Sequence, residues 1–158
     1  MTKSNAPDTT PPDDGRTMFE LLNEVGIIAQ LSRALLESRL EDGLTIHHFG
    51  ALNHLVRLGD GRTPIDMARA FQVPKTSMSH TLAGLEKRGL IHLVPNPADG
   101  RGKLVILTDA GRDVRERAIH TIGPDIARLV PEFEPGEAQS ILPVLRKLRT
   151  LLDNARDR

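Results

Sequence analysis

Histidines are the side chains most able to catalyse a reaction or bind a metal here, because the chain contains six of them and no cysteine. His47 and His48 are adjacent, so on a helix they would point about 100° apart, and His54 lies two turns beyond His47. A compact zinc site would therefore need ligands from elsewhere. The sequence also lacks a glycine-rich phosphate loop followed by lysine, a serine nucleophile elbow and a histidine pair at i and i+4. We expect no enzyme, no metal site and no cofactor.

A charged, glycine-broken segment lies further along the chain, in the sequence NPADGRGKLVILTDAG of residues 96–111. A loop that only reversed the chain would not need Asp99, Arg101 and Lys103 at its tip. Glycines on both sides of Arg101 allow it to approach another backbone closely. Arg101 could then enter a minor groove or bind a phosphate, with Asp99 holding its guanidinium in position. The alternative is a solvated hairpin tip in which glycine and aspartate only satisfy the turn geometry.

The segment of residues 75–88 is predicted to be a helix with two different faces. Met78, Leu82 and Leu85 fall on one side. The other side is small, polar and weakly basic, without the long acid–base pairs of an ordinary solvated helix: Lys75, Thr76, Ser79, His80, Ala83 and Lys87. Such a face can enter a major groove, where short polar groups reach phosphates and base edges. Taken alone, the pattern is equally compatible with an ordinary surface helix.

A helix-turn-helix and a hairpin would position these residues. Thr63-Pro64 predicts a capping residue followed by proline at the first position of a short helix, IDMARAF. Gln72-Val73-Pro74 ends that helix and the next one follows at once, which is the layout of a helix-turn-helix. A hairpin comes directly after it, with predicted strands at 91–94 and 104–107 and a connection at 95–102. The hairpin would project beside the second helix as a wing.

Long amphipathic helices are predicted on both sides of this unit. Apolar residues recur every three or four positions from Met18 to Leu40, and Asp42-Gly43 should end that helix with a left-handed residue. Thr45 is then expected to cap the next helix. After the hairpin, Thr108 should cap a helix that pauses at Gly123-Pro124, resumes and breaks at Pro131.

The last helix opens near Pro135 and should be kinked or locally broken by Pro143. One face of this helix carries more apolar residues than a helix surrounded by water would have. They are Ala138, Ile141, Leu142, Leu145, Leu148, Leu151 and Leu152. This face must be covered by the first helix of the same chain or of a second chain, and periodicity does not choose between them.

Composition indicates a single domain with extra helices, because 158 residues can bury a core of their own. The 21 basic and 21 acidic residues cancel, so any electrostatic attraction to nucleic acid must be local. Between residues 60 and 112, eight basic residues stand against five acidic ones. The absence of cysteine, of an apolar run long enough to span a bilayer and of a signal-peptide core predicts a cytoplasmic protein that does not contact a membrane.

Four segments are therefore predicted. Residues 1–15, rich in Pro, Asp, Thr and Ser, form a disordered tail. They are followed by a dimerisation helix at 16–43, a winged helix-turn-helix lobe at 44–108 and C-terminal dimerisation helices at 109–158. The assignment of the outer helices to dimerisation depends on the following resemblance.

Three runs, LTIHHFGALNHL, TPIDMARAFQVPKTSMSHTLAGLEKRGLI and NPADGRGKLVILTDAGRDV, resemble in order and spacing the MarR family of bacterial winged helix-turn-helix regulators. The resemblance covers roughly residues 18–155 and is most specific in LEKRGLI, NPADGRGK and LTDAG. It implies a mainly α fold with a small antiparallel β hairpin (α+β), in which a winged helix-turn-helix is flanked by long N- and C-terminal dimerisation helices. It also implies a homodimer, acting as a repressor on a pseudo-palindromic operator in double-stranded DNA.

The resemblance implies two sets of site residues. The expected DNA contacts are Thr63, Lys75, Thr76, Ser77, Ser79, His80, Asp99, Arg101 and Lys103. A small anionic or aromatic effector would lie between the dimer helices and the DNA-binding lobes, near His47 or His48. His80 stands where the family often has arginine and Pro74 where it often has a serine cap, which leaves the base preference open and shifts the start of the recognition helix. The alternative is a winged helix that binds protein, which would need an acidic or apolar recognition face.

Overall fold

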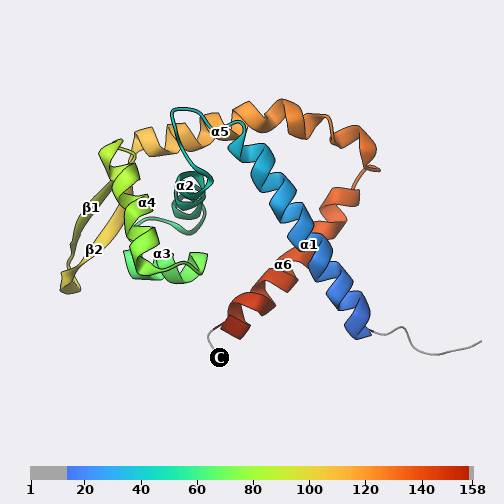
Figure 1. Ribbon diagram of the computed structural model, residues 1–158, viewed down its shortest axis with the longest axis horizontal. Coiled ribbons are helices and arrows are strands. Elements are labelled where there is room, and N and C mark those ends of the chain that lie inside the picture. The colour runs from blue at the N-terminus through green and yellow to red at the C-terminus, as the bar shows by residue number, and fades with distance from the viewer. Residues whose placement is uncertain (1–13, 157–158) are drawn as a thin grey trace, which may run out of the picture.

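The protein combines a small lobe with long helices that extend from it (Figure 1). The structure, a computed structural model, describes residues 14–156. The lobe contains α2 (Ile46–Leu58), α3 (Pro64–Phe71), α4 (Lys75–Lys87), β1 (Ile91–Asn96) and β2 (Asp99–Leu107). The long helices are α1 (Asp14–Glu37), α5 (Asp109–Ala127) and α6 (Glu137–Arg156), with a short 3₁₀ turn, η1 (Val130–Glu132), before α6. The predicted α+β winged helix is confirmed.

Two helices of the lobe, α2 and α3, begin where the sequence supplies a cap. The Thr45 hydroxyl accepts a hydrogen bond from the backbone N–H of His48, and Thr63 Oγ1 accepts one from the N–H of Asp66. Pro64 occupies the first turn of α3, where a missing N–H costs nothing. Gln72, with a φ of 55°, ends α3 in the left-handed conformation and turns the chain into α4.

One apolar cluster holds the lobe together, and its members come from every element between α2 and β2. They are Ala51, Leu52, Leu55, Met67, Ala68, Met78, Leu82, Leu85, Leu90, Ile91, Val105 and Leu107. The inward-facing residues predicted for α4 are all among them. Because α4 buries this whole stripe, its opposite face is fixed outward.

The hairpin is longer than the sequence predicted. Its strands pair in antiparallel register from Ile91–Leu107 to Asn96–Asp99, so only Pro97 and Ala98 turn the chain. The expectation of a loop over 95–102 was therefore wrong. The strands extend further because Pro95 lies near the end of β1, where a missing ladder donor is tolerated, and because Asn96 Oδ1 accepts the N–H of Ala98 and closes the turn.

Both ends of α1 and the course of α5 also differ from the predictions. Helix α1 begins at Asp14, so the last two residues of the predicted tail are helical; residues 1–13 lie outside the described residues. It ends at Glu37, several residues before the left-handed Asp42 and Gly43. Helix α5 continues through Gly123-Pro124 to Ala127, because the proline removes only one donor and Arg128 N–H still bonds the carbonyl of Pro124. Helix α6 contains Pro143 in its interior, where the sequence placed it.

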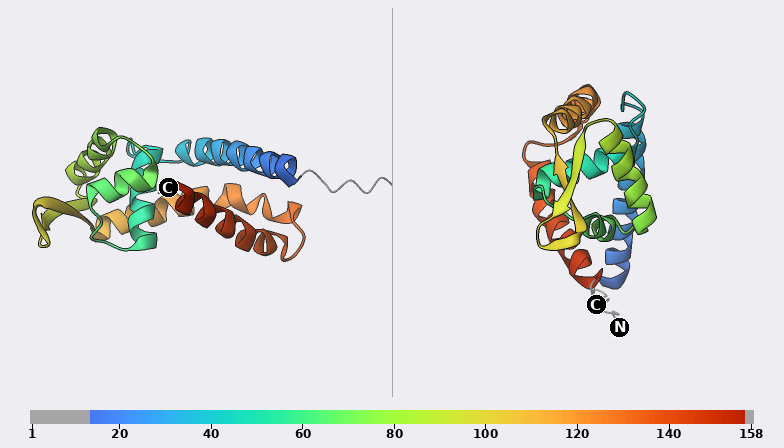
Figure 2. Two further views of the ribbon diagram at one scale, coloured as in Figure 1. Left: turned by 90° about the horizontal axis from the view of Figure 1, so that it is seen from below. Right: turned by 90° about the vertical axis from the view of Figure 1, so that its left-hand side faces the viewer.

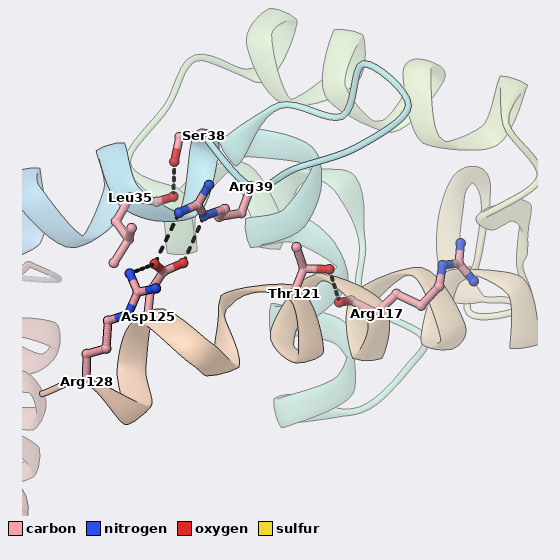
Figure 3. Close-up of polar contacts among 7 residues, drawn as sticks. All are labelled: Leu35, Ser38, Arg39, Arg117, Thr121, Asp125 and Arg128. Carbon is pink, nitrogen blue, oxygen red and sulfur yellow. Dashed lines mark hydrogen bonds and ion pairs between the residues drawn. The ribbon is translucent and has the colours of Figure 1, made fainter. Parts of the chain in front are cut away.

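An ion pair between α5 and the end of α1 fixes the turn after Pro124 (Figure 3). Arg39 Nε and Nη2 donate to the two carboxylate oxygens of Asp125 at 2.8 and 3.1 Å, and Arg128 approaches the same carboxylate at 3.6 Å. The hydrogen bond from Arg39 and its charge lower the pKa of Asp125. Since Arg39 directly follows α1 and Asp125 lies in the last turns of α5, the pair ties the two long helices together where they leave the lobe.

The long helices extend away from the lobe (Figure 2, left), and they expose large apolar side chains. Helix α1 buries none of its residues. The exposed set on α1 includes Phe19 at 70% and Leu31 at 64%, and α6 exposes Leu151 at 57% and Leu152 at 53%. Among residues 14–156, no helix is long and apolar enough to cross a membrane.

Candidate nucleic-acid interface

Helix α4 presents its predicted polar face to solvent. Lys75, Thr76, Ser77, Ser79 and His80 are exposed, whereas Met78, Leu82 and Leu85 are buried beneath them. The helix and the hairpin lie together at the end of the molecule that is remote from α1 and α6 (Figures 1 and 2). The arrangement therefore leaves room for a duplex to approach both elements at once.

The first turn of α4 has no side-chain cap. Pro74 occupies the N-cap position and makes no capping hydrogen bond, and Met78 N–H is the first to bond back, to the Pro74 carbonyl at 3.1 Å. The N–H groups of Lys75, Thr76 and Ser77 consequently point out of the helix end, where the helix dipole favours an anion. Backbone donors, two hydroxyls and the Lys75 ammonium together form a set that suits a phosphate group. With Pro74 at the N-cap, α4 starts at Lys75 and no side chain caps these donors.

Arg101 lies in a bulge of the wing. The strand register passes from Pro95–Lys103 directly to Asn96–Asp99, so Gly100, Arg101 and Gly102 have no partner on β1. Asp99 Oδ1 accepts the backbone N–H of Arg101 at 3.2 Å. A Cβ on Gly102 would lie 3.2 Å from Asp99 Oδ2, whereas one on Gly100 would meet nothing within 4 Å. Asp99 therefore shapes the bulge through the backbone of Arg101, and the absence of a side chain at Gly102 leaves room for the Asp99 carboxylate.

Three acidic residues of the lobe accept hydrogen bonds from other groups of the protein. Asp60 accepts the N–H of Leu107 at 2.9 Å and pairs with Arg112 at 3.1 Å. Glu86 accepts the N–H of Leu93 at 3.1 Å, and Asp66 accepts the Thr63 hydroxyl at 2.7 Å. These three carboxylates therefore help to hold the scaffold of the lobe together.

Thr63 and Arg62 join the wing to the helix-turn-helix. The Thr63 hydroxyl caps α3 and donates to Asp66, so it is less available for the direct DNA contact that was predicted for it. Arg62 and Gly61 exchange backbone hydrogen bonds with Val105, at 2.9 and 3.0 Å, so this segment acts as a short third strand on β2. This bridge was not predicted from the sequence, because only the fold brings its residues together.

A family model supports the same interpretation over the part of the chain that contains these residues. It is described as the MarR family and matches residues 42–102. The apo structure of wild-type MarR from E. coli is 25% identical over 81% of this chain and 95% of that chain, with a TM-score of 0.69. Residues 42–102 therefore match the MarR family, and the chain as a whole resembles this MarR structure in fold. MarR-family proteins are transcriptional regulators and not enzymes, so this protein is a DNA-binding transcriptional regulator.

Two further MarR-like structures share the fold. A mutant of E. coli MarR in complex with operator DNA is 24% identical over 86% of this chain and 98% of that one, with a TM-score of 0.65. BpsR from Bordetella bronchiseptica, whose DNA binding is regulated by 6-hydroxynicotinic acid, is 24% identical over 82% of this chain and 98% of that one, also with a TM-score of 0.65.

A groove of roughly 600 Å³ opens between the lobe and the long helices. Apolar side chains from α1, α2 and α5 line it, together with the polar groups of Ser32, Arg33 and His47. His48 is not among its lining residues: the ring is turned toward the N-terminus of α2 and toward α4. Of the two histidines predicted for an effector site, the structure places only His47 at this groove.

Proposed function

We propose that this protein is a homodimeric repressor that binds a pseudo-palindromic operator. The observation that carries the proposal is the shared outward orientation of the uncapped, polar face of α4 and the Arg101 bulge of the wing. Two such surfaces in a dimer would occupy successive major grooves, about one helical turn apart. Operator DNA bound to an E. coli MarR mutant provides a precedent in a protein of this fold. Because the proposed partner is chromosomal DNA, the protein would act in the cytoplasm.

The exposed apolar faces of α1 and α6 support the dimer. Within one chain they face solvent, and an apolar surface of this extent on both long helices is typical of a buried interface. A second copy of the chain carries the same exposed apolar faces, so the two copies can cover each other. The predicted domains follow from this: residues 44–108 bind DNA, and the helices on either side of them pair with the other chain.

Each predicted contact residue receives a role. Lys75, Thr76 and Ser77 bind a phosphate at the start of α4, and Ser79 and His80 face the bases. Arg101 enters the flanking minor groove, and Lys103 binds the backbone beside it. Asp99 and Thr63 act through the backbone conformations that they fix.

The groove at His47 is the proposed effector site. Its apolar lining suits an aromatic ring, and Arg33 and His47 can bind a carboxylate. Regulation of BpsR by 6-hydroxynicotinic acid, an aromatic acid, is a precedent of the same chemistry. Helices α1 and α5 form one wall of this groove, and the lobe forms the other. An effector that binds more tightly when these walls are further apart or closer together would shift the protein toward that arrangement. If DNA binds the other arrangement better, the effector would release the DNA.

Selection of genomic fragments by the purified protein, followed by fluorescence anisotropy, tests the proposal. The selected duplex and a shuffled duplex are titrated at several salt concentrations. We expect saturable preference for the selected duplex with two chains per site. Equal, weak and steeply salt-dependent binding to both duplexes would contradict sequence-specific recognition and favour a protein partner instead.

A further inference from the structure

His48 completes the N-terminal cap of α2. Its backbone N–H donates to Thr45 Oγ1 at 3.3 Å, and the backbone N–H of Thr45 donates to His48 Nδ1 at 3.1 Å. This is a capping box in which histidine replaces the usual glutamate or glutamine. Because Nδ1 accepts a hydrogen bond, it must carry a lone pair, so the neutral ring has its proton on Nε2.

The opposite edge of the ring lies against the recognition helix. A Cβ built on Gly84 of α4 would be 2.6 Å from His48 Nε2 and 3.5 Å from Cε1, which is closer than side chains approach one another. Gly84 is helical and has no positive φ, so glycine is required here for space and not for backbone conformation. Glycine in a helix interior is unfavourable relative to alanine, which indicates that the contact with His48 matters.

The surroundings of the ring disfavour its charged form. Partial burial lowers the pKa of His48, and the positive charges of Arg88, His47 and His80 lower it further. His80 lies on α4, Arg88 is the C-cap residue of α4, and His47 lies on α2. The α1–α2 loop carries Glu41 and Asp42, but Arg88 contacts this loop through the backbone carbonyl oxygens of Asp42 and Gly43.

We propose that neutral His48 is a positioning residue for the recognition helix, and that its protonation loosens the α2–α4 contact and weakens DNA binding. An imidazolium has N–H groups on both nitrogens and cannot accept from Thr45 N–H. Its Nδ1–H could turn to Thr45 Oγ1, 3.1 Å away, but the backbone donor of Thr45 would then lose its partner. The new charge would also lie at the positive end of the α2 dipole and beside Arg88. This inference rests on the proposed DNA-binding role of α4.

The sign of the pH effect follows from the lowered pKa. The unfolded chain binds a proton at its ordinary histidine pKa of about 6.5, while the folded chain resists protonation. The contribution of His48 to stability is therefore complete above about pH 6.5 and is lost as the pH falls toward the folded-state pKa. Between pH 7.5 and 5.5, this linkage can raise the unfolding constant by up to about tenfold.

His48→Gln is the decisive variant, because glutamine keeps the capping box and does not titrate. Urea unfolding and duplex anisotropy are measured from pH 7.5 to 5.5 for the full chain, for His48→Gln and for His120→Gln, which removes a histidine of α5. We expect the wild type and His120→Gln to lose stability on acidification relative to His48→Gln, by up to the factor given above, and to lose duplex affinity in the same direction. Protonation of a DNA-facing histidine such as His80 would strengthen binding instead, so the sign separates the two.

Gly84→Ala tests the contact from the other side. The added methyl would displace the ring, so this variant should bind the selected duplex more weakly at pH 7.5 and show a flattened pH profile. Absence of specific duplex binding by the wild type at pH 7.5 would overturn the proposed function and this inference together. Specific binding at pH 7.5 with the same pH profiles for the wild type and His48→Gln would overturn this inference alone. Loss of stability without loss of duplex affinity would also overturn it, because the cap would then be structural only.

Discussion

Gly111 sits where α5 leaves the lobe, and its replacement by alanine should destabilise the protein. A Cβ at this position would lie 2.2 Å from the Leu90 carbonyl oxygen, 2.8 Å from Leu107 Cδ1 and 3.1 Å from the Leu90 carbonyl carbon. The Leu90 carbonyl also accepts the N–H of Thr108, at 3.2 Å. Since the nearest obstructing atoms belong to the backbone, no side-chain rotation can relieve the clash.

The expected magnitude combines two opposing effects. Overpacking of this kind costs about 1–3 kcal/mol, and the rigid neighbours place Gly111→Ala near the upper end. Better helix propensity returns up to about 1 kcal/mol, which leaves a loss of about 2 kcal/mol. For a chain of this length, that corresponds to a fall in Tm of about 4–8 °C.

Gly123→Ala provides a matched control in the same helix, because a Cβ there would meet nothing within 4 Å. Both variants are compared with the wild type by thermal unfolding at one protein concentration, since dimerisation makes Tm concentration-dependent. Gly123→Ala should stay within about 1 kcal/mol of the wild type. Equal Tm values for the two variants would refute the claim that the close approach of α5 to Leu90 constrains this glycine.

Three further predictions concern DNA, the helix junction and the dimer. Arg101→Ala should weaken duplex binding and lower the salt slope by about 0.9 for each phosphate that the protein no longer binds, or about 1.8 for two chains, as measured by anisotropy against salt. Asp125→Asn should lower Tm at pH 7, and the difference from the wild type should close below about pH 4, because the stability that Arg39 confers on the carboxylate is present above the unfolded-state pKa and lost as the pH falls through the lowered folded-state value. Leu31→Glu should shift the protein toward monomer in sedimentation velocity, because it places a charge on the exposed apolar face of α1.

Each of these predictions has a control of the same chemistry elsewhere in the chain. Arg117→Ala removes an exposed charge from α5, and an equal fall in salt slope would argue against a contact by the wing. Asp113→Asn removes an exposed carboxylate from α5 and should leave Tm unchanged across the same pH range. Leu58→Glu alters an exposed leucine of the lobe, at 45%, and should leave the oligomeric state unchanged; dissociation by this variant instead of Leu31→Glu would place the interface elsewhere.

The helices of the lobe could be predicted from sequence because their signals are local. Caps at Thr45, Thr63 and Thr108 and the apolar spacing of α4 lie within a few residues of what they control. The identity of the outward face of α4 followed from the same periodicity. The family resemblance then related that face to DNA.

The wrong predictions have both local and distant components. Helix α5 passes Pro124 because the proline removes only one hydrogen-bond donor; the pair of Asp125 in the next turn with Arg39, 86 residues away, is not predicted by any local pattern. The hairpin extends into 95–102 for a local reason, because Asn96 closes the turn and the bulge at Arg101 takes up the extra residues. The positions of Asp60 and Glu86 on backbone donors of β2 and β1, in contrast, required the fold.

The role of His48 has a signal in the sequence. Thr45 and His48 have the spacing of a capping box, with histidine in the place of glutamate. Its contact with Gly84 joins residues 36 positions apart and could not be read from spacing. An isolated glycine inside a predicted helix nevertheless indicates a close neighbour, so Gly84 predicts that another element packs tightly against α4.

The central claim is that two recognition helices, held at a fixed separation by one dimer, bind one duplex. It is tested most directly by insertion of half a helical turn, about five base pairs, between the two halves of the selected site. We predict that affinity for the lengthened duplex falls to that of a shuffled duplex, because the second helix then faces the wrong side of the DNA. Undiminished affinity, with two chains still bound, would show that the chains bind independently and would contradict the account.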